Sequence, residues 1–168
     1  MTNHSLLTPR LILRRFSQDD VPALHEIMSD AEAMRYWSTL PHATLAVTED
    51  FIARTIDMCQ SGESDDFAVI HDGALIGKVG LWSGNELGFI FSRRVWGKGL
   101  AREAIAAVIA RGFAHGHRTI WADVDPRNAR ALALLDRFGF VKTGEAQRTF
   151  LIGTDWVDSV YLELHAAV

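Results

Sequence analysis

Cysteine is nearly absent from this sequence, in which Cys59 is the only one among 168 residues. This excludes an intrachain disulfide and a cysteine-based metal site, and a reducing cytoplasm fits it better than secretion. Cys59 has no basic residue close to it in the sequence, so we do not expect it to act as a nucleophile. Only four residues are proline, which is not the composition of a disordered chain.

Long apolar runs and a basic excess are missing as well. No apolar run approaches the about 20 residues that cross a membrane, and residues 1–5 lack the basic and apolar regions of a signal peptide. The formal net charge is −4, which gives no electrostatic reason to expect nucleic acid or an acidic membrane as a partner. We therefore expect a cytoplasmic protein whose main partner is neither nucleic acid nor a membrane. The sequence leaves open whether it forms a homodimer.

The composition that remains is that of a globular protein. Hydrophobic residues make up 48% of the chain, and a chain of this length buries roughly 70% of its unfolded surface. We find no repeat, low-complexity tract or linker that would separate two domains. The sequence therefore predicts a single domain over residues 1–168.

The hydrophobic period changes along the chain and predicts the element order β-α-α-β-β-β-α-β-α-β-β, a mixed α/β fold. Asp72-Gly73 is a strong hairpin signal between two apolar strands. In the helix predicted over 44–58, Val47, Phe51 and Ile56 are expected to face inward. The predicted elements are strands at 11–16, 67–71, 74–79, 86–91, 119–124, 141–151 and 156–164, and helices beginning near 19, 44, 101 and 126.

One loop carries most of the chemical signal. The strand ending at Phe91 runs into Trp96-Gly97-Lys98-Gly99-Leu100-Ala101 and then into an amphipathic helix. Helix amino termini expose unpaired N–H groups and favour negative charge, and glycines let a phosphate approach the backbone. Lys98 and Arg102 add positive charge, and Arg93 and Arg94 extend it at the rim. A plain helix-entry turn is the alternative reading of the glycines.

Two other phosphate loops do not fit this segment. A P-loop requires Ser or Thr after Gly-Lys, but Gly99 follows Lys98. A dinucleotide fingerprint would place glycine where Arg102 stands.

Several motifs together resemble the GNAT acetyltransferases. Residues 96–101, followed by Glu103-Ala104, resemble the pyrophosphate loop of that family, and Asp125-Pro126-Arg127-Asn128 resembles the segment whose asparagine contacts the pantetheine arm. Trp96 at the first loop position, the opening Thr8-Pro9-Arg10-Leu11-Ile12-Leu13-Arg14 and the closing Trp156-Val157-Asp158-Ser159-Val160 resemble the Rim-type branch, which acts on protein amino termini.

The resemblance implies a mostly antiparallel sheet of about seven strands with about four helices. It also implies that strands 86–91 and 119–124 form a splayed parallel pair, with acetyl-CoA bound in the slot between them. Backbone groups of the first strand would pair with pantetheine, loop N–H groups would hold the pyrophosphate, and Asn128 would orient the arm or simply cap its helix. The implied cofactor residues are Phe89, Ile90, Phe91, Trp96, Gly97, Lys98, Gly99, Leu100, Ala101, Arg102 and Asn128.

The implied reaction is attack of a neutral primary amine on the thioester. A backbone N–H near Phe91 is a candidate oxyanion donor. Glu86 and Asp123, on the two bordering strands, are candidate bases with Asp123 slightly preferred, although each could be a structural or surface carboxylate. Tyr36 and Trp37 are predicted to line the acceptor pocket, with ordinary aromatic core as the alternative.

Two departures concern the acid that protonates the leaving thiolate. Many members of the family have tyrosine where this chain has Leu135, and Rim-type members often have serine in place of Ala131. An acyl-CoA-binding module without turnover therefore stays open, as do a small amine or antibiotic as acceptor and a nucleotide-phosphate binder. His115 and His117 have no companion ligands in sequence, so no metal is expected, and Glu103 is expected only to complement the helix dipole.

Overall fold

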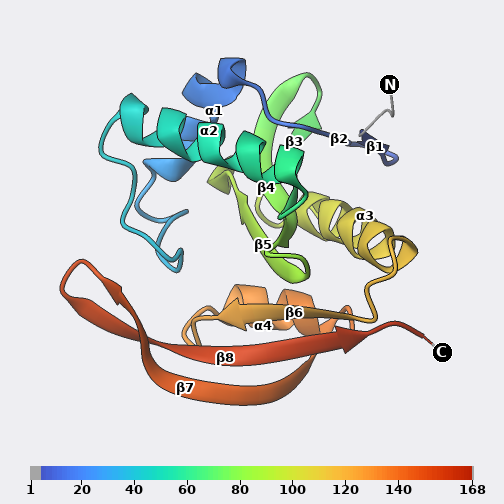
Figure 1. The fold of residues 1–168 in the computed structure, drawn as a ribbon. Coiled ribbons are helices and arrows are strands. Elements are labelled where there is room, and N and C mark those ends of the chain that lie inside the picture. Colours follow the sequence, from blue (N-terminus) through green and yellow to red (C-terminus); the bar gives the residue numbers. More distant parts are fainter. Residues whose placement is uncertain (1–4, 168) are drawn as a thin grey trace.

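The computed structural model describes residues 5–167, which form one mixed sheet in the strand order β1-β2-β3-β4-β5-β6-β8-β7 (Figure 1). All neighbouring strands in it are antiparallel except β5 and β6, which are parallel. This confirms the predicted fold class. The strands are β1 Leu6–Leu7, β2 Ile12–Arg14, β3 Asp65–His71, β4 Ala74–Trp82, β5 Glu86–Phe91, β6 Thr119–Val124, β7 Val141–Ile152 and β8 Asp155–His165.

Four α-helices are described, and local sequence explains their ends. Pro22 lies in the first turn of α1, where its missing N–H removes no helical bond, and Gly62 ends α2 in the left-handed conformation with φ of 84°. Short 3-10 turns precede α1 and α3. The helices are α1 Val21–Met28, α2 Leu45–Ser61, α3 Leu100–Ala114 and α4 Ala129–Asp136, and the 3-10 turns are η1 Gln18–Asp20 and η2 Arg93–Val95.

The helices cover the two faces of the sheet in pairs. Side chains of α3 and α4 pack in one buried cluster with residues of β5 and β6, including Leu87 and Ala122. Residues of α1 and α2 form a second cluster with Ala68 and Ile90 on the opposite face. Because side chains alternate along a strand, each residue of β5 and β6 faces either the α3 and α4 side or the α1 and α2 side of the sheet.

The prediction for the inward face of α2 is confirmed for two of its three residues. Phe51 and Ile56 are partly buried and pack against the second cluster, whereas Val47 is 42% exposed. The fully buried residues of α2 are Thr48, Ile52 and Thr55. Thr48 can be buried because its hydroxyl oxygen lies 2.7 Å from Nδ1 of His25 and 2.9 Å from Nδ1 of His42. A buried polar group with such partners is stable in the core, and apolar periodicity alone cannot show this.

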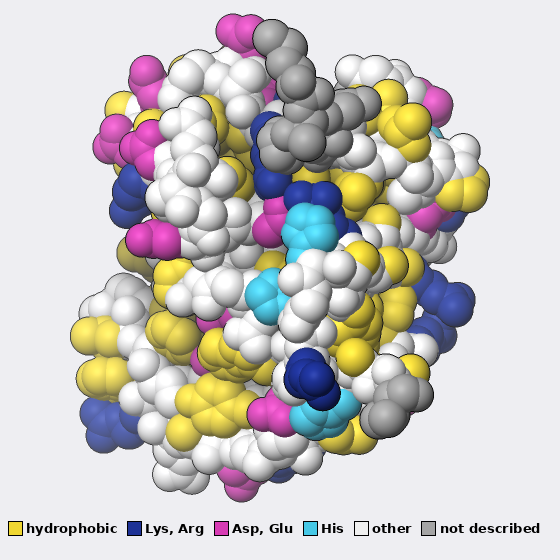
Figure 2. Space-filling model, turned by 45° about the vertical axis from the view of Figure 1, so that its right-hand side comes forward, with side chains coloured by type: hydrophobic (Ala, Val, Ile, Leu, Met, Phe, Trp, Pro, Cys, Tyr) yellow, Lys and Arg dark blue, Asp and Glu magenta, His cyan; other side chains and the backbone are white. Residues whose placement is uncertain are grey.

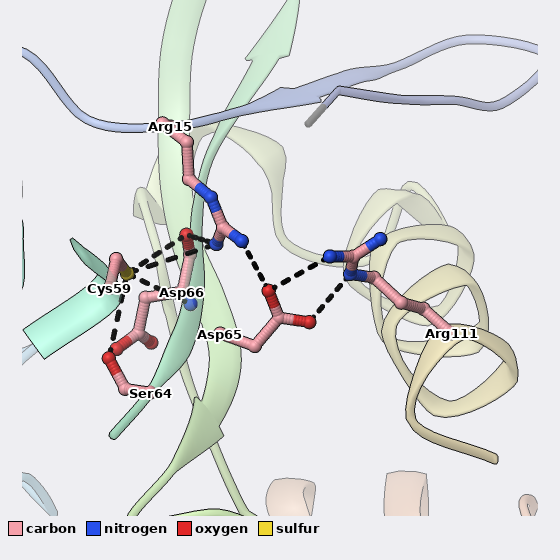
Figure 3. A network of polar contacts seen from close by, with 6 residues as sticks. All are labelled: Arg15, Cys59, Ser64, Asp65, Asp66 and Arg111. Carbon is pink, nitrogen blue, oxygen red and sulfur yellow. Dashed lines mark hydrogen bonds and ion pairs between the residues drawn. The ribbon is translucent and has the colours of Figure 1, made fainter. Parts of the chain in front are cut away.

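A polar network ties the start of β3 to α3 (Figure 3). The Asp65 carboxylate accepts hydrogen bonds from Arg111 Nε at 2.6 Å and from Arg15. Burial would raise the pKa of Asp65, but the two guanidinium groups outweigh it and hold the pKa below its ordinary value. Cys59 belongs to this network, where its sulfur accepts from the Asp66 N–H at 3.4 Å and from Arg15 Nη1 at 3.8 Å.

The charges on the face seen in Figure 2 are interspersed, with basic and acidic side chains next to one another over the described residues. Within residues 5–167, no helix combines the length and apolar character needed to cross a membrane. Residues 1–4, where we expect no signal peptide, lie outside the described part.

Candidate active site

The parallel strands β5 and β6 touch only at their beginnings. Their ladder has one pair, Glu86 with Trp121, and beside it the Trp121 N–H donates to the Asn85 carbonyl at 3.1 Å. The Asn85 side chain fastens the same end by donating to the Thr119 carbonyl at 2.9 Å. Beyond this point the strands diverge, as Figure 1 shows. The splayed pair that the family resemblance implies is therefore present.

Backbone alternation decides which groups of β5 face the opening. The Ser92 N–H donates to a β4 carbonyl, while the Asn85 carbonyl accepts from β6. Successive residues of a strand direct their N–H and C=O groups to opposite sides. The polar backbone groups of Phe89 and Phe91 therefore face the opening, whereas those of Ile90 face β4. Ile90 can contact a ligand there only through its side chain.

The glycine loop has the backbone that the sequence requires. Gly97 and Gly99 both have φ of 75°, a conformation that L side chains rarely adopt, and Gly99 is the N-cap of α3. Leu100 is 1% exposed and its side chain packs in the core, so it offers the loop only its backbone N–H. Lys98 and Arg102 are exposed beside this helix end.

Trp96 connects the loop to β5. Its indole Nε1–H donates to the Phe91 carbonyl at 3.0 Å, and its ring lies 4.5 Å from the Arg130 guanidinium carbon. The Phe91 carbonyl is therefore already paired, while its N–H stays on the open side. Arg93 and Arg94 do not join the loop charges, because they pair with Asp30 at 2.6 Å and Glu26 at 3.4 Å.

A pocket of about 850 Å³ joins the loop, the splayed strand and the start of α4. Its lining includes Tyr36 and Trp37, the predicted acceptor residues, together with eight of the eleven predicted cofactor residues. Lys98, Leu100 and Arg102 are the three that do not line it. The pocket is lined by Glu32, Ala33, Arg35, Tyr36, Trp37, Phe89, Ile90, Phe91, Val95, Trp96, Gly97, Gly99, Ala101, Arg127, Asn128, Ala129, Arg130, Ala131, Ala133, Leu134 and Arg137.

The lining residues that were not predicted include four arginines, Arg35, Arg127, Arg130 and Arg137. The guanidinium carbons of Arg35 and Arg127 lie 5.5 and 5.9 Å from the centre of the Tyr36 ring. Arg127 also pairs with Asp125 at 2.6 Å. The motif around Asn128 contains Arg127, but nothing in the sequence shows that it meets Tyr36. Trp37 lines the pocket and also packs partly against the second core cluster, so both roles considered for it from the sequence are present.

The start of α4 shows what Asn128 and the two departures do. The Asn128 side-chain oxygen accepts the Ala131 N–H at 3.2 Å, so Asn128 caps the helix while its amide NH₂ is left as a donor. Ala131 and Leu135 are 8% and 0% exposed. Neither can donate a proton.

The two candidate bases lie on one face of the sheet. Glu86 pairs with Trp121, and Asp123 follows Trp121 by two residues, so the three side chains share the face that Ile90 presents to α1 and α2. Burial and the nearby Asp123 raise the pKa of Glu86 to about 7. Burial also raises the pKa of Asp123, and a hydrogen bond from Ser159 opposes this. Neither carboxylate lines the pocket, which lies further along β5.

Glu103 does more than complement the helix dipole, because it accepts hydrogen bonds from Thr8 and Arg10. Within residues 5–167, no group of three or more His, Cys, Asp or Glu side chains is arranged to hold a metal ion.

Comparison with known proteins gives a consistent assignment. Residues 10–141 match the acetyltransferase (GNAT) domain family. The uncharacterized N-acetyltransferase p20 of Bacillus licheniformis is 31% identical over 149 residues, which cover 83% of this chain and 84% of that protein. Spermidine N(1)-acetyltransferase of Escherichia coli is 26% identical over 155 residues, covering 88% and 82%.

Solved structures share the fold. A GNAT-family acetyltransferase from Bacillus anthracis has a TM-score of 0.82 at 25% identity, over 96% of this chain and 98% of that one. An acetyltransferase of Salmonella typhimurium that modifies the N-terminal serine of a ribosomal protein has a TM-score of 0.86 at 16% identity, over 95% and 97%. The second likeness speaks for the fold alone.

Proposed function

This chain belongs to the GNAT acetyltransferase family, and from that premise we propose that it acetylates the primary amine at a protein or peptide N-terminus, as Rim-type enzymes do. The coarser activity, N-acetyl transfer from acetyl-CoA, is that of the family, and relatives of this fold have been solved with acetyl-CoA or CoA. The pocket that joins the glycine loop, the open side of β5 and Tyr36 supports the coarser activity, and the positive charge of its lining carries the finer proposal.

We assign the donor as follows. The N–H groups of residues 97–102 hold the pyrophosphate at the amino terminus of α3, where the dipole favours negative charge. The pantetheine arm pairs with Phe89 and with the N–H of Phe91, as an added strand would. Asn128 lines the same pocket and its oxygen caps α4, which leaves its amide NH₂ to donate to the arm.

Glu86 is the better candidate for the base. A general base works best when its pKa lies near the operating pH, and the pKa of Glu86 is raised to about 7. Burial raises the pKa of Asp123, a hydrogen bond from Ser159 opposes this, and the negative charge of Asp123 helps to raise the pKa of Glu86. Because Glu86 lies near the apex of the splayed strands, it takes the proton through water. This reverses the slight preference for Asp123 drawn from the sequence.

The remaining steps are assigned to the pocket. As the amine attacks, the carbonyl oxygen becomes negative, and the Phe91 N–H on the open side of β5 can donate to it. The leaving thiolate then needs a proton, which Leu135 and Ala131 cannot give. Among the lining residues of the described chain, Tyr36 alone carries a hydroxyl, so Tyr36 or water supplies that proton.

The charge of the pocket favours a peptide acceptor. Its lining contains four arginines and one glutamate, and a polyamine would bring several positive charges against them. A peptide N-terminus brings one ammonium group and carbonyl oxygens that can accept from arginine. The likeness to spermidine N(1)-acetyltransferase favours a small amine as the second candidate. The cytoplasmic location, the single domain and the homodimer stay predictions.

The test is CoA release from acetyl-CoA with peptides of varied first residue, spermidine and an aminoglycoside. Each peptide is matched by the same peptide with a blocked amino terminus. Release with free but not blocked peptides, and an added acetyl group on the N-terminal residue by mass spectrometry, is the expected result. Faster turnover of spermidine or the aminoglycoside would replace the peptide by a small amine. CoA binding with no release for any amine would leave a module without turnover.

A further inference from the structure

The segment before β2 is fastened to the first turn of α3 through one carboxylate. Glu103 accepts from the Thr8 hydroxyl at 2.6 Å, from the Arg10 N–H at 2.8 Å and from Arg10 Nε at 2.7 Å. The Glu103 side chain is 15% exposed. Three donors on one shielded carboxylate, from residues more than ninety positions away in sequence, form a specific tertiary contact.

The same arginine also reaches the glycine loop. Arg10 Nη1 donates to the Lys98 carbonyl at 3.0 Å, and Arg10 Nη2 lies 3.5 Å from the place a Cβ on Gly99 would occupy. The Glu103 N–H in turn donates to the Gly99 carbonyl at 3.1 Å. One guanidinium therefore links the carboxylate of α3 to the peptide group that precedes Gly99.

This link orients a loop amide. In a planar trans peptide the carbonyl and the following N–H point in opposite directions. Because Arg10 holds the Lys98 carbonyl, the Gly99 N–H points away from Arg10. Glycine has no side chain to restrict this peptide, so without the link its orientation is less restrained.

The position of Arg10 needs its carboxylate partner. A cation near a helix amino terminus is opposed by the dipole, and Glu103 offsets that repulsion. Burial would raise the pKa of Glu103, but the donors from Thr8 and Arg10 outweigh it and keep the pKa below its ordinary value. The Arg10 side chain is still 47% exposed. It thus sets the loop and adds positive charge beside it.

We propose that Arg10, held by Thr8 and Glu103, is a positioning residue that sets the glycine loop for the phosphates of acetyl-CoA. The inference rests on the proposed function, since it takes this loop as the phosphate site. It makes the docking of the segment before β2 and the binding of CoA depend on each other, because coupling between two sites is reciprocal.

The experiment compares two donors, acetyl-CoA and S-acetylpantetheine, which keeps the thioester but lacks the pyrophosphate. Arg10→Ala should raise the Kd for CoA and the KM for acetyl-CoA about tenfold, the scale of one hydrogen bond to a charged group. Turnover of S-acetylpantetheine should change by less than about twofold, since it never reaches the loop. Arg10→Lys keeps the charge but lacks the fork that reaches both partners, so it should recover only part of the affinity.

Arg14→Ala is the matched control, because Arg14 also carries a guanidinium, on β2, that pairs with a carboxylate, Asp20 at 2.7 Å. It should lower stability and leave the ratio of the two donors unchanged. An equal loss with both donors in Arg10→Ala, no loss with either, or full recovery in Arg10→Lys would overturn the proposal. Failure of the wild-type chain to bind CoA would instead show that the proposed function is wrong.

Discussion

Replacing Glu86 with glutamine should make the protein more stable at pH 8 and less active at the same time. Glu86 is half-buried, and burial with the nearby Asp123 raises its pKa from 4.5 to about 7. One pKa unit corresponds to about 1.4 kcal/mol, so ionising a fully shielded Glu86 would cost the fold about 3.5 kcal/mol. Solvent screening of a half-buried group reduces this, and we expect about 1.5 kcal/mol.

The pH at which the effect develops follows from the sign of the change. Below pH 4.5 Glu86 is protonated in the folded and the unfolded chain, so its contribution to stability is fully present. Between pH 4.5 and 7 the unfolded chain loses the proton first, and the wild type loses stability as the pH rises. Glutamine does not titrate. The free energy of unfolding of Glu86→Gln should therefore approach that of the wild type near pH 4 and exceed it by about 1.5 kcal/mol at pH 8.

Urea unfolding from pH 4 to 8.5 measures this difference. Glu103→Gln serves as the control of opposite sign, because the pKa of Glu103 is lowered and its carboxylate stabilises the fold above pH 4.5. A difference between Glu86→Gln and the wild type that is the same at pH 4 and pH 8 would refute the reasoning.

Activity should move in the other direction. Loss of a positioned base lowers turnover by roughly a hundredfold near neutrality, with partial recovery at high pH where more of the amine is already neutral. Asp123→Asn removes the neighbouring charge and should lower the pH at which turnover rises, with a smaller loss. Wild-type rates in both variants across the pH range would mean that neither carboxylate is the base.

Three further changes test the loop, the cap and the core. Gly99→Val should abolish the roughly 2.7 kcal/mol that CoA adds to the free energy of unfolding at about 100 times its Kd. The valine Cβ would meet no atom closer than 3.5 Å, so the cause of the loss is the strained φ. A full thermal shift with CoA would contradict this. Asn128→Ala should cost about 1 kcal/mol as a lost cap and also weaken CoA binding in calorimetry; a cap alone would leave CoA affinity intact. His42→Gln should reduce the loss of stability below pH 6.5. Burial, with the charges of His25 and Arg54, lowers the pKa of His42, so the unfolded chain takes up the proton first as the pH falls. The same fall in the free energy of unfolding below pH 6.5 in wild type and variant, measured by urea unfolding, would count against it.

Local sequence signals predicted β5 and β6, the two strands that diverge to form the slot. The bounds of β5 and β6 agree with the sequence at both ends, because each is a short apolar run that ends at polar or turn residues. The predicted start of α4 at Pro126 is early. The Asp125 carboxylate accepts the Arg127 N–H at 2.9 Å in a turn, so the helix begins only after Asn128 caps it.

Contacts between distant residues could not be predicted in the same way. Arg93 and Arg94 lie shortly after β5, so the sequence suggested that they add charge to the glycine loop. They instead form ion pairs with Asp30, which follows α1, and with Glu26, which lies in α1. The link from Arg10 to Glu103 spans 93 positions. Charge in the sequence therefore indicates that a phosphate site is feasible, while the fold decides which arginines belong to it.

Four partly buried carboxylates of the chain form two pairs whose pKa values are shifted in opposite directions. Asp65 and Glu103 each bind a guanidinium, which outweighs burial and lowers their pKa. Glu86 and Asp123 are also half-buried, yet among residues 5–167 neither forms an ion pair with a cationic side chain, and both pKa values are raised. A half-buried carboxylate without a cationic partner costs stability, so folding gives no reason to keep it. The proposed role as a base would supply one, because a group that destabilises the resting protein can still accept the proton of the attacking amine.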